Sequence, residues 1–340
     1  VGDSTFNVLD YGAKGDGKND DTSAIQKALD AAKDASGGTV LLPGDHTFLS
    51  KALSIDGSHI AFQLDGTLLI SNDRKHWPGE VDIITASHAS NLAFTGNGTV
   101  DGQGLVWWQN RDDYRPRMMY LENCDTVIID GLTFKDSPNH NLELYADHTE
   151  VSGITILAPP STGTSNPSHN TDGIDVHGLY MYIHDSVINT GDDNIAAHSN
   201  HTLVSNCQFG TGHGASIGSL AEGSYVTNIT FDRIVFTNTT TAMRIKVHTN
   251  AKNGRCSNVT YSNLSMENVA QTVDVTMFYD GGDGGDATYV VDNISFVNIK
   301  AKNSGAPGEF VCDKHSPCRG ILLDNFTHED TDGSFTCSEA

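Results

Sequence analysis

The chain has few basic residues: 20 Lys and Arg stand against 43 Asp and Glu, which gives a formal net charge of −23. A nucleic-acid-binding surface needs clustered positive charge, so this balance excludes nucleic acid as a partner. No stretch reaches the roughly 18 consecutive apolar residues that a membrane-spanning helix needs, so no such helix is expected. After residue 40 the sequence also lacks long amphipathic helical patterns, which disfavours leucine-rich and ankyrin repeats.

In place of helices, a short strand motif recurs along the chain. Each copy reads apolar, polar and turn-former, followed by a strand of alternating apolar and polar residues. The third positions of the copies are separated by 22, 32, 21, 27, 30 and 35 residues, and they are Gly131, Gly153, Asp185, Asn206, Arg233, Asn263 and Asn298. A period of 20 to 35 residues built from strands and turn residues is typical of a solenoid. The sequence therefore predicts an all-β fold, a parallel β-helix, with the whole chain 1–340 as a single domain.

The two ends of a β-helix expose strand edges and need covers. One convincing helix is expected from about Thr22 to Ala35, with Ser23 and Gln26 in capping-box spacing. The strand at 39–42 then begins the first coil. We expect an N-terminal cap over about 1–38 and a Cys-containing C-terminal cap over about 305–340.

Several features indicate export. The chain begins at Val1 without Met, and we expect that a leader was removed before it. Eight Asn-x-Ser/Thr sequons are compatible with a secreted glycoprotein, although Asn and Thr also suit the turns and strands of this repeat; they begin at Asn97, Asn200, Asn228, Asn238, Asn258, Asn263, Asn293 and Asn325. Six Cys allow 15 pairings, of which only Cys312 with Cys318 is predicted; reduced structural thiols are the alternative.

Charged residues form a column with nearly the same period. Asp172, Asp193 and His213 follow one another at intervals close to the shortest spacing of the repeat, and a longer interval leads on to Arg244, with Lys246 on the same face of that strand. If each interval is one coil, these side chains lie on strands about 4.8 Å apart. Asp192 precedes Asp193, and both reach one site only where the backbone leaves regular strand geometry.

This column has the chemistry of glycosidic bond cleavage. One carboxyl group protonates the leaving oxygen while another activates water, and a clustered third raises the pKa of the acid. Each member also has a purely structural interpretation. Asp193 could hydrogen-bond to the backbone, and His213 could be a turn residue between glycines. Arg244 and Lys246 could simply neutralise the carboxylates. Alternatively, the two cations bind a carboxylate of the substrate. Protonation of all 15 His would change the net charge from −23 to −8, so an acidic working environment is expected.

Four motifs resemble one family in order and spacing. Asn170-Thr171-Asp172-Gly173, Gly191-Asp192-Asp193, Gly212-His213-Gly214 and Arg244-Ile245-Lys246 are similar to the motifs of the polygalacturonases, family 28 of the glycoside hydrolases. The segment from Phe6 to Gly17, and Asp101-Gly102-Gln103-Gly104 with Trp107-Trp108, extend the resemblance over nearly the whole chain. The resemblance implies a right-handed β-helix and a secreted enzyme that hydrolyses α-1,4 bonds between galacturonates of pectin with inversion.

The resemblance also implies a role for each residue. Asp192 is the general acid, Asp172 and Asp193 position and deprotonate the water, and His213 supports the acid. The residues expected to bind substrate are Asn170, Gly214, Arg244, Lys246 and Tyr279. Two positions depart from the family pattern: Asn194 replaces a frequent Cys, so Cys207 pairs elsewhere or stays free, and the frequent Gln two residues before Tyr279 is missing. We expect no metal, no cofactor and no membrane or nucleic-acid partner, and a monomer that binds polysaccharide.

Several questions stay open at this point. Side chains one coil apart lie near 5 Å, whereas inverting pairs need about 6.5 to 9.5 Å, so inversion rests on the resemblance. A calcium-dependent lyase would use the Asp-rich and Gly-rich segment 280–286, and a non-catalytic carbohydrate-binding β-helix would need no carboxylate cluster. Internal or terminal cleavage, and homogalacturonan or xylogalacturonan as substrate, are not distinguished by the sequence.

Overall fold

The structure of the protein is a computed structural model that describes residues 2, 4–77, 79–109, 113–159, 168–282, 284–329 and 333–339. The chain divides into two compact units. Unit 1 comprises residues 1–174 and 190–192, and unit 2 comprises residues 175–189 and 193–340. That the whole chain is one domain therefore stays a prediction.

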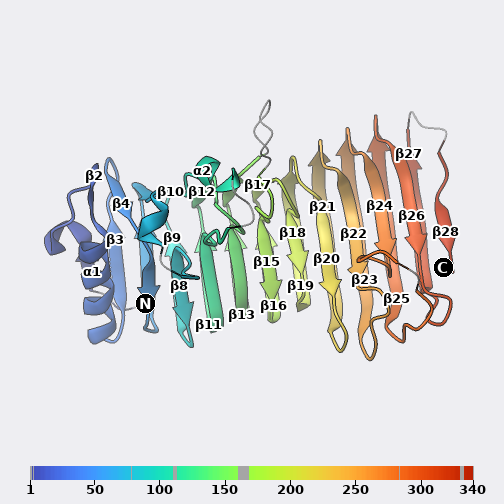
Figure 1. The fold of residues 1–340 in the computed structure, drawn as a ribbon, viewed down its shortest axis with the longest axis horizontal. Coiled ribbons are helices and arrows are strands. Elements are labelled where there is room, and N and C mark those ends of the chain that lie inside the picture. The colour runs from blue at the N-terminus through green and yellow to red at the C-terminus, as the bar shows by residue number, and fades with distance from the viewer. Residues whose placement is uncertain are drawn as a thin grey trace. The chain divides into compact units, whose positions relative to one another are not determined.

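Unit 1 is built from short strands with little helix (Figure 1). Its strands are β1 Thr5–Asn7, β2 Asp16–Asp20, β3 Gly38–Leu42, β4 Thr47–Ser50, β5 Leu53–Ile55, β6 Ile60–Leu64, β7 Thr67–Ile70, β8 Ile84–Ser87, β9 Ser90–Thr95, β10 Thr99–Asp101, β11 Met119–Asp130, β12 Thr133–Lys135, β13 Leu142–Ser152 and β14 Thr155–Leu157. Its helices are the 3-10 helices η1 Val8–Tyr11 and η2 Arg74–His76 and the α-helices α1 Thr22–Asp34 and α2 Leu105–Trp108.

Unit 2 consists of strands and connections throughout its described residues. The strands are β15 Ile174–His177, whose first residue belongs to unit 1, β16 Leu179–His184, β17 Val187–Asn189, β18 Ile195–Ala197, β19 Asn200–Phe209, β20 Ala215–Leu220, β21 Tyr225–Thr237, β22 Thr241–Val247, β23 Arg255–Glu267, β24 Gln271–Thr276, β25 Val290–Lys302, β26 Ala306–Val311, β27 Arg319–His328 and β28 Thr336–Ser338.

Strands one coil apart pair in parallel and place equivalent side chains in register. In unit 1 one inward row runs through Val40, Phe62, Phe94, Ile129 and Val151, each at most 1% exposed. In unit 2 an inward row on successive coils includes Phe231, Tyr261 and Phe296. Their rings stack nearly parallel, with centroids 5.0 Å apart for the first pair and 5.2 Å apart for the second. Stacked aromatic rings bury large apolar areas, so these rows form the core and confirm the predicted parallel β-helix.

The turn-forming third position of the repeat has a common backbone conformation. All seven residues assigned to it have a positive φ, between 52° and 75°. Asn and Gly tolerate this left-handed region better than other residues, which explains their recurrence in the sequence. Because the position recurs on successive coils, Asn263, Asn298 and Asn325 also share side-chain hydrogen bonds along the turn, at 3.0 and 2.8 Å. Asn263 and Asn325, which begin two of the sequons, therefore have a structural use, and glycosylation stays a prediction.

Helix α1 covers the N-terminal end of unit 1, where it packs on β1, β3 and β5. Its bounds confirm the predicted helix to within one residue, but the predicted capping box is wrong. The residue before the helix is Asp21, whose side chain makes no capping bond and accepts from the backbone N–H groups of Lys14 and Gly15. Gln26 exchanges two hydrogen bonds with the backbone of Ser54 in β5. Tertiary pairing thus replaces the local cap.

The first coil begins earlier than the sequence suggested. Strand β1 pairs with β3, and β2 pairs with β4, although both precede the helix in the chain. The strand at 39–42 is therefore the second one along its row. A strand as short as Thr5–Asn7 gives an alternation too brief to stand out in the sequence.

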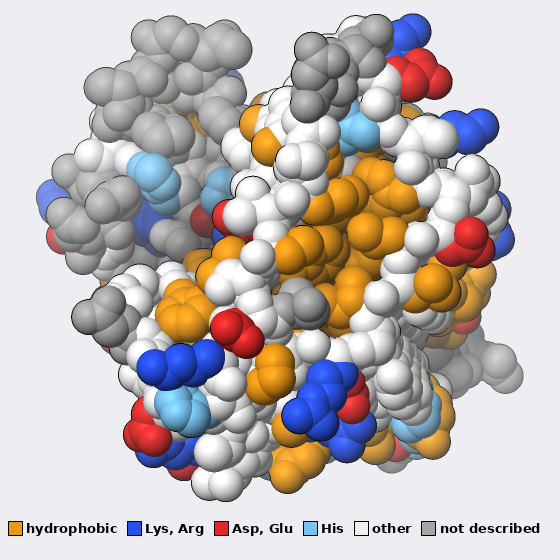
Figure 2. All heavy atoms as spheres, turned by 90° about the vertical axis from the view of Figure 1, so that its right-hand side faces the viewer, with side chains coloured by type: hydrophobic (Ala, Val, Ile, Leu, Met, Phe, Trp, Pro, Cys, Tyr) orange, Lys and Arg blue, Asp and Glu red, His pale blue; other side chains and the backbone are white. Residues whose placement is uncertain are grey.

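The C-terminal coil of unit 2 leaves apolar side chains exposed. Leu323 continues the inward row after Phe296 but is 40% exposed, since no described strand pairs beyond β27 on that row. Figure 2 shows hydrophobic side chains gathered on this face. The Cys312–Cys318 disulfide is confirmed, while Cys124, Cys207 and Cys256 are buried free thiols and Cys337 is an exposed one. Among the described helices, none is long and apolar enough to cross a membrane.

Candidate active site

The predicted site residues fall into two groups, one in each unit. The Asp172 group consists of Asn170, Asp172 and Asp192 in unit 1. The Asp193 group consists of Asp193, His213, Gly214, Arg244, Lys246 and Tyr279 in unit 2. The Asp192–Asp193 peptide bond joins the two groups in the chain.

Asn170 and Asp192 meet in unit 1 although they lie far apart along the chain. The Asn170 backbone N–H donates to Asp192 Oδ2 over 3.3 Å, and the Gly191 N–H donates to Thr171 Oγ1 over 2.9 Å. A Cβ atom on Gly191 would lie 2.2 Å from the Ser168 carbonyl oxygen. Only glycine fits there, which lets the chain approach the preceding coil closely. As predicted, the two adjacent aspartates lie outside regular strand, in the connection between β17 and β18.

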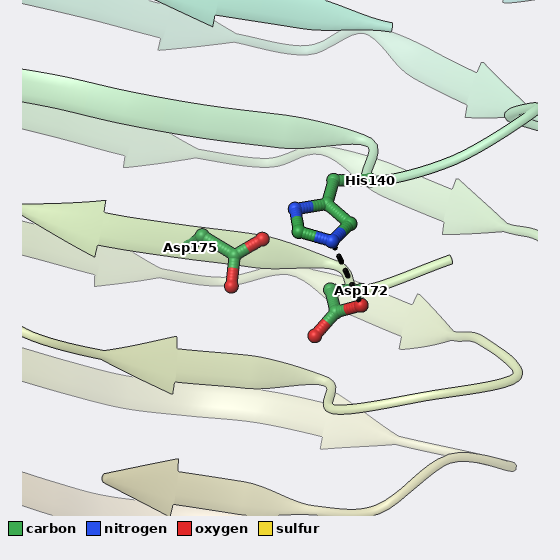
Figure 3. A group of neighbouring side chains, drawn as sticks. All are labelled: His140, Asp172 and Asp175. Atoms are coloured by element: carbon green, nitrogen blue, oxygen red, sulfur yellow. Dashed lines mark ion pairs between the residues drawn. The ribbon is translucent and has the colours of Figure 1, made fainter. Parts of the chain in front are cut away.

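Asp172 is nearly buried, with its side chain 11% exposed, and it faces a histidine that the sequence argument missed. His140 Nε2 lies 3.5 Å from Asp172 Oδ1, as Figure 3 shows. The Asp172 carbonyl oxygen accepts from the Asn141 backbone N–H at 2.8 Å and from Asn141 Nδ2 at 3.0 Å. The loop between β12 and β13 therefore holds both the backbone and the carboxylate of Asp172.

A charged network continues from His140 through unit 1. His140 Nδ1 lies 3.2 Å from Glu143 Oε2, and Arg117 Nη1 donates to the same oxygen over 2.9 Å. Arg117 also forms a forked pair with Asp82, at 3.0 and 2.6 Å. Burial by itself would raise the pKa of Glu143, but the hydrogen bonds from His140 and Arg117 outweigh it and lower that pKa to about 2. Glu143 is therefore ionised across the acidic range.

In unit 2, the carboxylate of Asp193 is buried among cations and a hydroxyl group. Its side chain is 2% exposed, and it contacts Lys246 Nζ, Arg244 Nη1 at 3.6 Å and His213 Nδ1 at 4.0 Å. Ser216 Oγ donates to Asp193 Oδ1 over 2.7 Å. Burial by itself would lower the pKa of Lys246, but the charge of Asp193 raises it above its ordinary value. Both partners are therefore charged, as a buried pair requires.

The structure corrects the predicted stacking of His213 with Arg244. Register pairs Arg244 with Ser216 on one side and with Asp274 on the other, so His213 belongs to a different row. Arg244 Nε donates to Asp274 Oδ2 over 3.3 Å. The interval from His213 to Arg244 is not one coil, because one coil from β20 to β22 leads from Ser216 to Arg244.

The Gly-His-Gly motif has a packing role in addition to any chemical one. Gly214 has a φ of +83°, and a Cβ atom there would lie 2.3 Å from the Thr241 carbonyl oxygen. Its N–H donates to Asn194 Oδ1 over 2.8 Å. Asn194, which replaces a frequent family Cys, thus ties the Asp193 segment to the next coil, and Cys207 is free. Burial raises the pKa of the Cys207 thiol to about 12, which makes it unreactive.

Tyr279 lies beside the cation pair, and its ring centroid is 5.3 Å from Lys246 Nζ. The ring is 43% exposed and open to a ligand. In the neighbouring acidic and Gly-rich segment, Asp280 pairs with His248 at 2.7 Å and Asp286 pairs with Lys252 at 2.6 Å. Asp283 lies outside the described residues. The two described carboxylates flanking this segment already have basic partners, which gives the calcium alternative no support.

Each group has a distinct chemical capacity. The Asp193 group places one buried carboxylate beside Lys246 and Arg244, where it can orient a water or accept its proton. The Asp172 group contains a second nearly buried carboxylate together with Asp192, whose carboxyl group can give up and take up a proton. The spacing of charged residues in the sequence does not identify the further members of the two groups, which are Ser216, Asp274, His140, Glu143 and Arg117. Extending the column by one more coil would have found Asp274, the register partner of Arg244, whereas no spacing signal marks His140.

Comparisons with known proteins agree with this chemistry. The model of the family described as glycosyl hydrolases family 28 matches residues 36–340. A polygalacturonase from Persea americana is 30% identical over 350 residues, covering 95% of this chain and 73% of that protein. The solved polygalacturonase of Erwinia carotovora is 26% identical with a TM-score of 0.72, covering 98% of each chain. A hyperthermoactive exopolygalacturonase from Thermotoga maritima, 21% identical, gives a TM-score of 0.85 over 95% of this chain and 86% of that one, and these likenesses confirm the right-handed β-helix.

Proposed function

The chain belongs to family 28 of the glycosyl hydrolases, and from this premise we propose that it hydrolyses α-1,4 bonds between galacturonate units of pectin with inversion. The observation that carries the proposal is the buried pairing of Asp193 with Lys246 and Arg244. Nearby cations keep a carboxylate ionised at acidic pH, and an ionised carboxylate is the base that inverting hydrolysis needs. Polygalacturonases among its relatives support the choice of substrate.

In this proposal Asp192 is the general acid, and Asp172 and Asp193 position and deprotonate the attacking water. His213, 4.0 Å from Asp193 Oδ1, supports the acid by adding positive charge when protonated. The proton of the water passes to a carboxylate while the proton of Asp192 passes to the leaving glycosidic oxygen, so the two groups exchange protonation states in one displacement. Solvent then restores them.

The proposed substrate-binding residues are Asn170, Gly214, Arg244, Lys246 and Tyr279. Arg244 has its Nε on Asp274 and its Nη1 near Asp193, and Lys246 pairs with Asp193. These pairs support the interpretation that both cations neutralise carboxylates of the protein. A galacturonate carboxylate of the substrate would share the same two cations. Tyr279 offers an exposed ring face for a sugar. We also propose that the protein is secreted and acts as a monomer.

Product analysis tests this function directly. Polygalacturonate should give new reducing ends, with ¹H NMR showing the inverted anomer first, and a chelator should leave the rate unchanged. Unsaturated products that depend on calcium would show a lyase, and binding without products would show a carbohydrate-binding protein. A chromatographic time course on polygalacturonate and xylogalacturonan separates internal from terminal cleavage and ranks the two substrates.

A further inference from the structure

His140 lies between two carboxylates of unit 1. Its Nε2 is 3.5 Å from Asp172 Oδ1 and its Nδ1 is 3.2 Å from Glu143 Oε2, so each ring nitrogen faces an acceptor (Figure 3 shows the Asp172 side). Neutral imidazole carries one N–H and can donate to only one of them, whereas imidazolium donates to both. The side chains of Asp172 and Glu143 are each 11% exposed, and that of His140 is 29% exposed. This geometry therefore favours the protonated ring.

We propose that His140 is a positioning residue for hydrolysis: its imidazolium holds Asp172 ionised and oriented, and Glu143 holds the imidazolium, which keeps the enzyme active at the acidic end of its range. The inference rests on the proposed function, in which Asp172 acts on the water. His140 itself need not touch the substrate.

The other charged groups around His140 leave this arrangement intact. Arg117 is shared between Glu143 and Asp82, and its forked bonds go to Asp82. Glu143 Oε2 thus accepts from Arg117 as well as facing His140, but Arg117 divides its own charge between Glu143 and Asp82, and burial limits screening by solvent. Arg115, from the same segment as Arg117, donates to the Pro138 and His169 carbonyl oxygens and over 2.8 Å to Asn170 Oδ1.

Two tyrosines and one further carboxyl group complete the set. The Arg117 guanidinium lies 3.8 Å from the Tyr120 ring centroid, and Tyr120 packs edge-on against Tyr145. Burial and the nearby charge of Glu143 raise the pKa of Tyr145 to about 12, so this phenol is neutral in acid. Asp175 follows shortly after Asp172 in the chain and belongs to unit 2. It is included as a variant in the test below.

The sign of the effect follows from the charges. A positive charge within 4 to 6 Å lowers the pKa of a carboxyl group by about 1 to 3 units. Without the imidazolium, Asp172 takes up its proton at a higher pH and ceases to act as a base there. The acid limb of kcat/KM should therefore move upward by about 1 to 3 pH units in His140→Gln, with little change at the optimum in KM.

The first experiment needs no activity. Histidine ring resonances of the ¹³C-labelled full chain are titrated by NMR, and His140 is assigned by its loss in His140→Gln. We expect His140 to titrate above the range of an ordinary histidine, and to titrate at least about one pH unit lower in Glu143→Gln and in Asp172→Asn. The titration of His140 in Asp175→Asn shows whether the Asp175 carboxyl group also affects the protonation of His140. An ordinary titration of His140, unmoved by Glu143→Gln and Asp172→Asn, would overturn the proposal.

The second experiment compares pH profiles of kcat/KM on polygalacturonate. His140→Gln should lose activity at low pH, whereas His140→Lys, which keeps a positive charge, should retain more of the acid limb. The matched control is His148→Gln, since His148 pairs with Asp125 at 3.0 Å in the same unit, outside this network. A raised KM with an unmoved acid limb would mean that His140 binds substrate and would refute the positioning role.

The two experiments separate this inference from the proposed function. If the wild-type protein does not cleave galacturonan, the proposed function fails, and the NMR titration still tests the pairing of His140. If the wild type cleaves it and His140→Gln has an unchanged pH profile, the inference alone fails.

Discussion

Asp193 in unit 2 and Asp172 in unit 1 are both nearly buried, yet their charges are maintained by different means. Asp193 contacts a lysine and an arginine, whose positive charges persist over the whole working range. Asp172 lies 3.5 Å from the ring of His140, whose charge can be lost. One carboxylate thus lies beside cations that keep their charge over the working range, while the other lies beside a histidine whose charge can titrate.

Asp192, between the two in function, has yet another environment. Its Oδ2 accepts from the Asn170 backbone N–H at 3.3 Å, and Asp192 is more exposed than either Asp172 or Asp193. A carboxyl group that must deliver a proton benefits from contact with solvent, which returns the proton after each turnover. The three carboxyl groups thus differ by environment rather than by residue type.

The largest effect is expected for Asp192→Asn. An amide keeps the shape of the side chain but has no proton to deliver, so kcat should fall by about 10² to 10⁴-fold while KM changes little. Initial rates on polygalacturonate measure it, with Asp185→Asn as a control at an exposed turn of unit 2. Turnover near that of the wild type would remove Asp192 from the role of acid.

Lys246→Met breaks the permanent pair on the unit 2 side of the comparison. It leaves Asp193 buried without its closest cation, and the free energy of unfolding should drop by about 3 to 5 kcal/mol, with a loss of kcat. Chemical denaturation measures the stability. Lys252→Met is the matched control, because Lys252 pairs with Asp286 on the exposed surface, where such a pair is worth about 0 to 1 kcal/mol. Equal losses in the two variants would contradict the buried-pair account.

Glu143→Gln probes the unit 1 side through the pH dependence of stability. The pKa of Glu143 lies at about 2 in the folded chain, below its unfolded value of 4.5, so its ionised form stabilises the fold above pH 4.5. That contribution should disappear as the pH falls towards 2. One pKa unit is worth about 1.4 kcal/mol, and with solvent screening the contribution is about 2 kcal/mol. Unfolding curves at pH 6 and pH 2.5 measure it.

The variant Glu122→Gln, at an exposed position of β11, serves as the control for Glu143→Gln. The difference between Glu143→Gln and the wild type should shrink with falling pH, while Glu122→Gln should show no such convergence. A constant difference at all pH values would mean that packing, rather than charge, explains the loss.

The smallest effect is expected for His213→Ala. His213 Nδ1 is 4.0 Å from Asp193 Oδ1, which already contacts Lys246 and Arg244, so its charge adds to a site that is largely neutralised. We expect kcat to fall by about tenfold, equivalent to about 1.4 kcal/mol, with a changed alkaline limb of the pH profile. Full activity and an unchanged profile would return His213 to a turn residue, since Gly214 alone explains the local packing.

The β-helix could be predicted because its signal is repeated. Positions such as Asn263 and Asn298 recur with the same left-handed φ, and each copy strengthens the same interpretation. The aspartates and the Arg-Lys pair stood out because they recur at nearly the period of the repeat. The row containing Arg244 was misjudged, since spacing in the sequence does not reveal where a loop adds residues.

The repeat, the turn residues and the carboxylates of the site can be read from the amino-acid sequence, because they depend on local backbone preference and on residue type. The partners of these side chains depend on the folded chain: Ser216 donates to Asp193, Asp274 pairs with Arg244, and His140 faces both Asp172 and Glu143. These contacts join side chains from different coils, and their distances depend on loop lengths and register. The physical reason is that electrostatic interactions act through space, whereas a sequence motif records only distance along the chain.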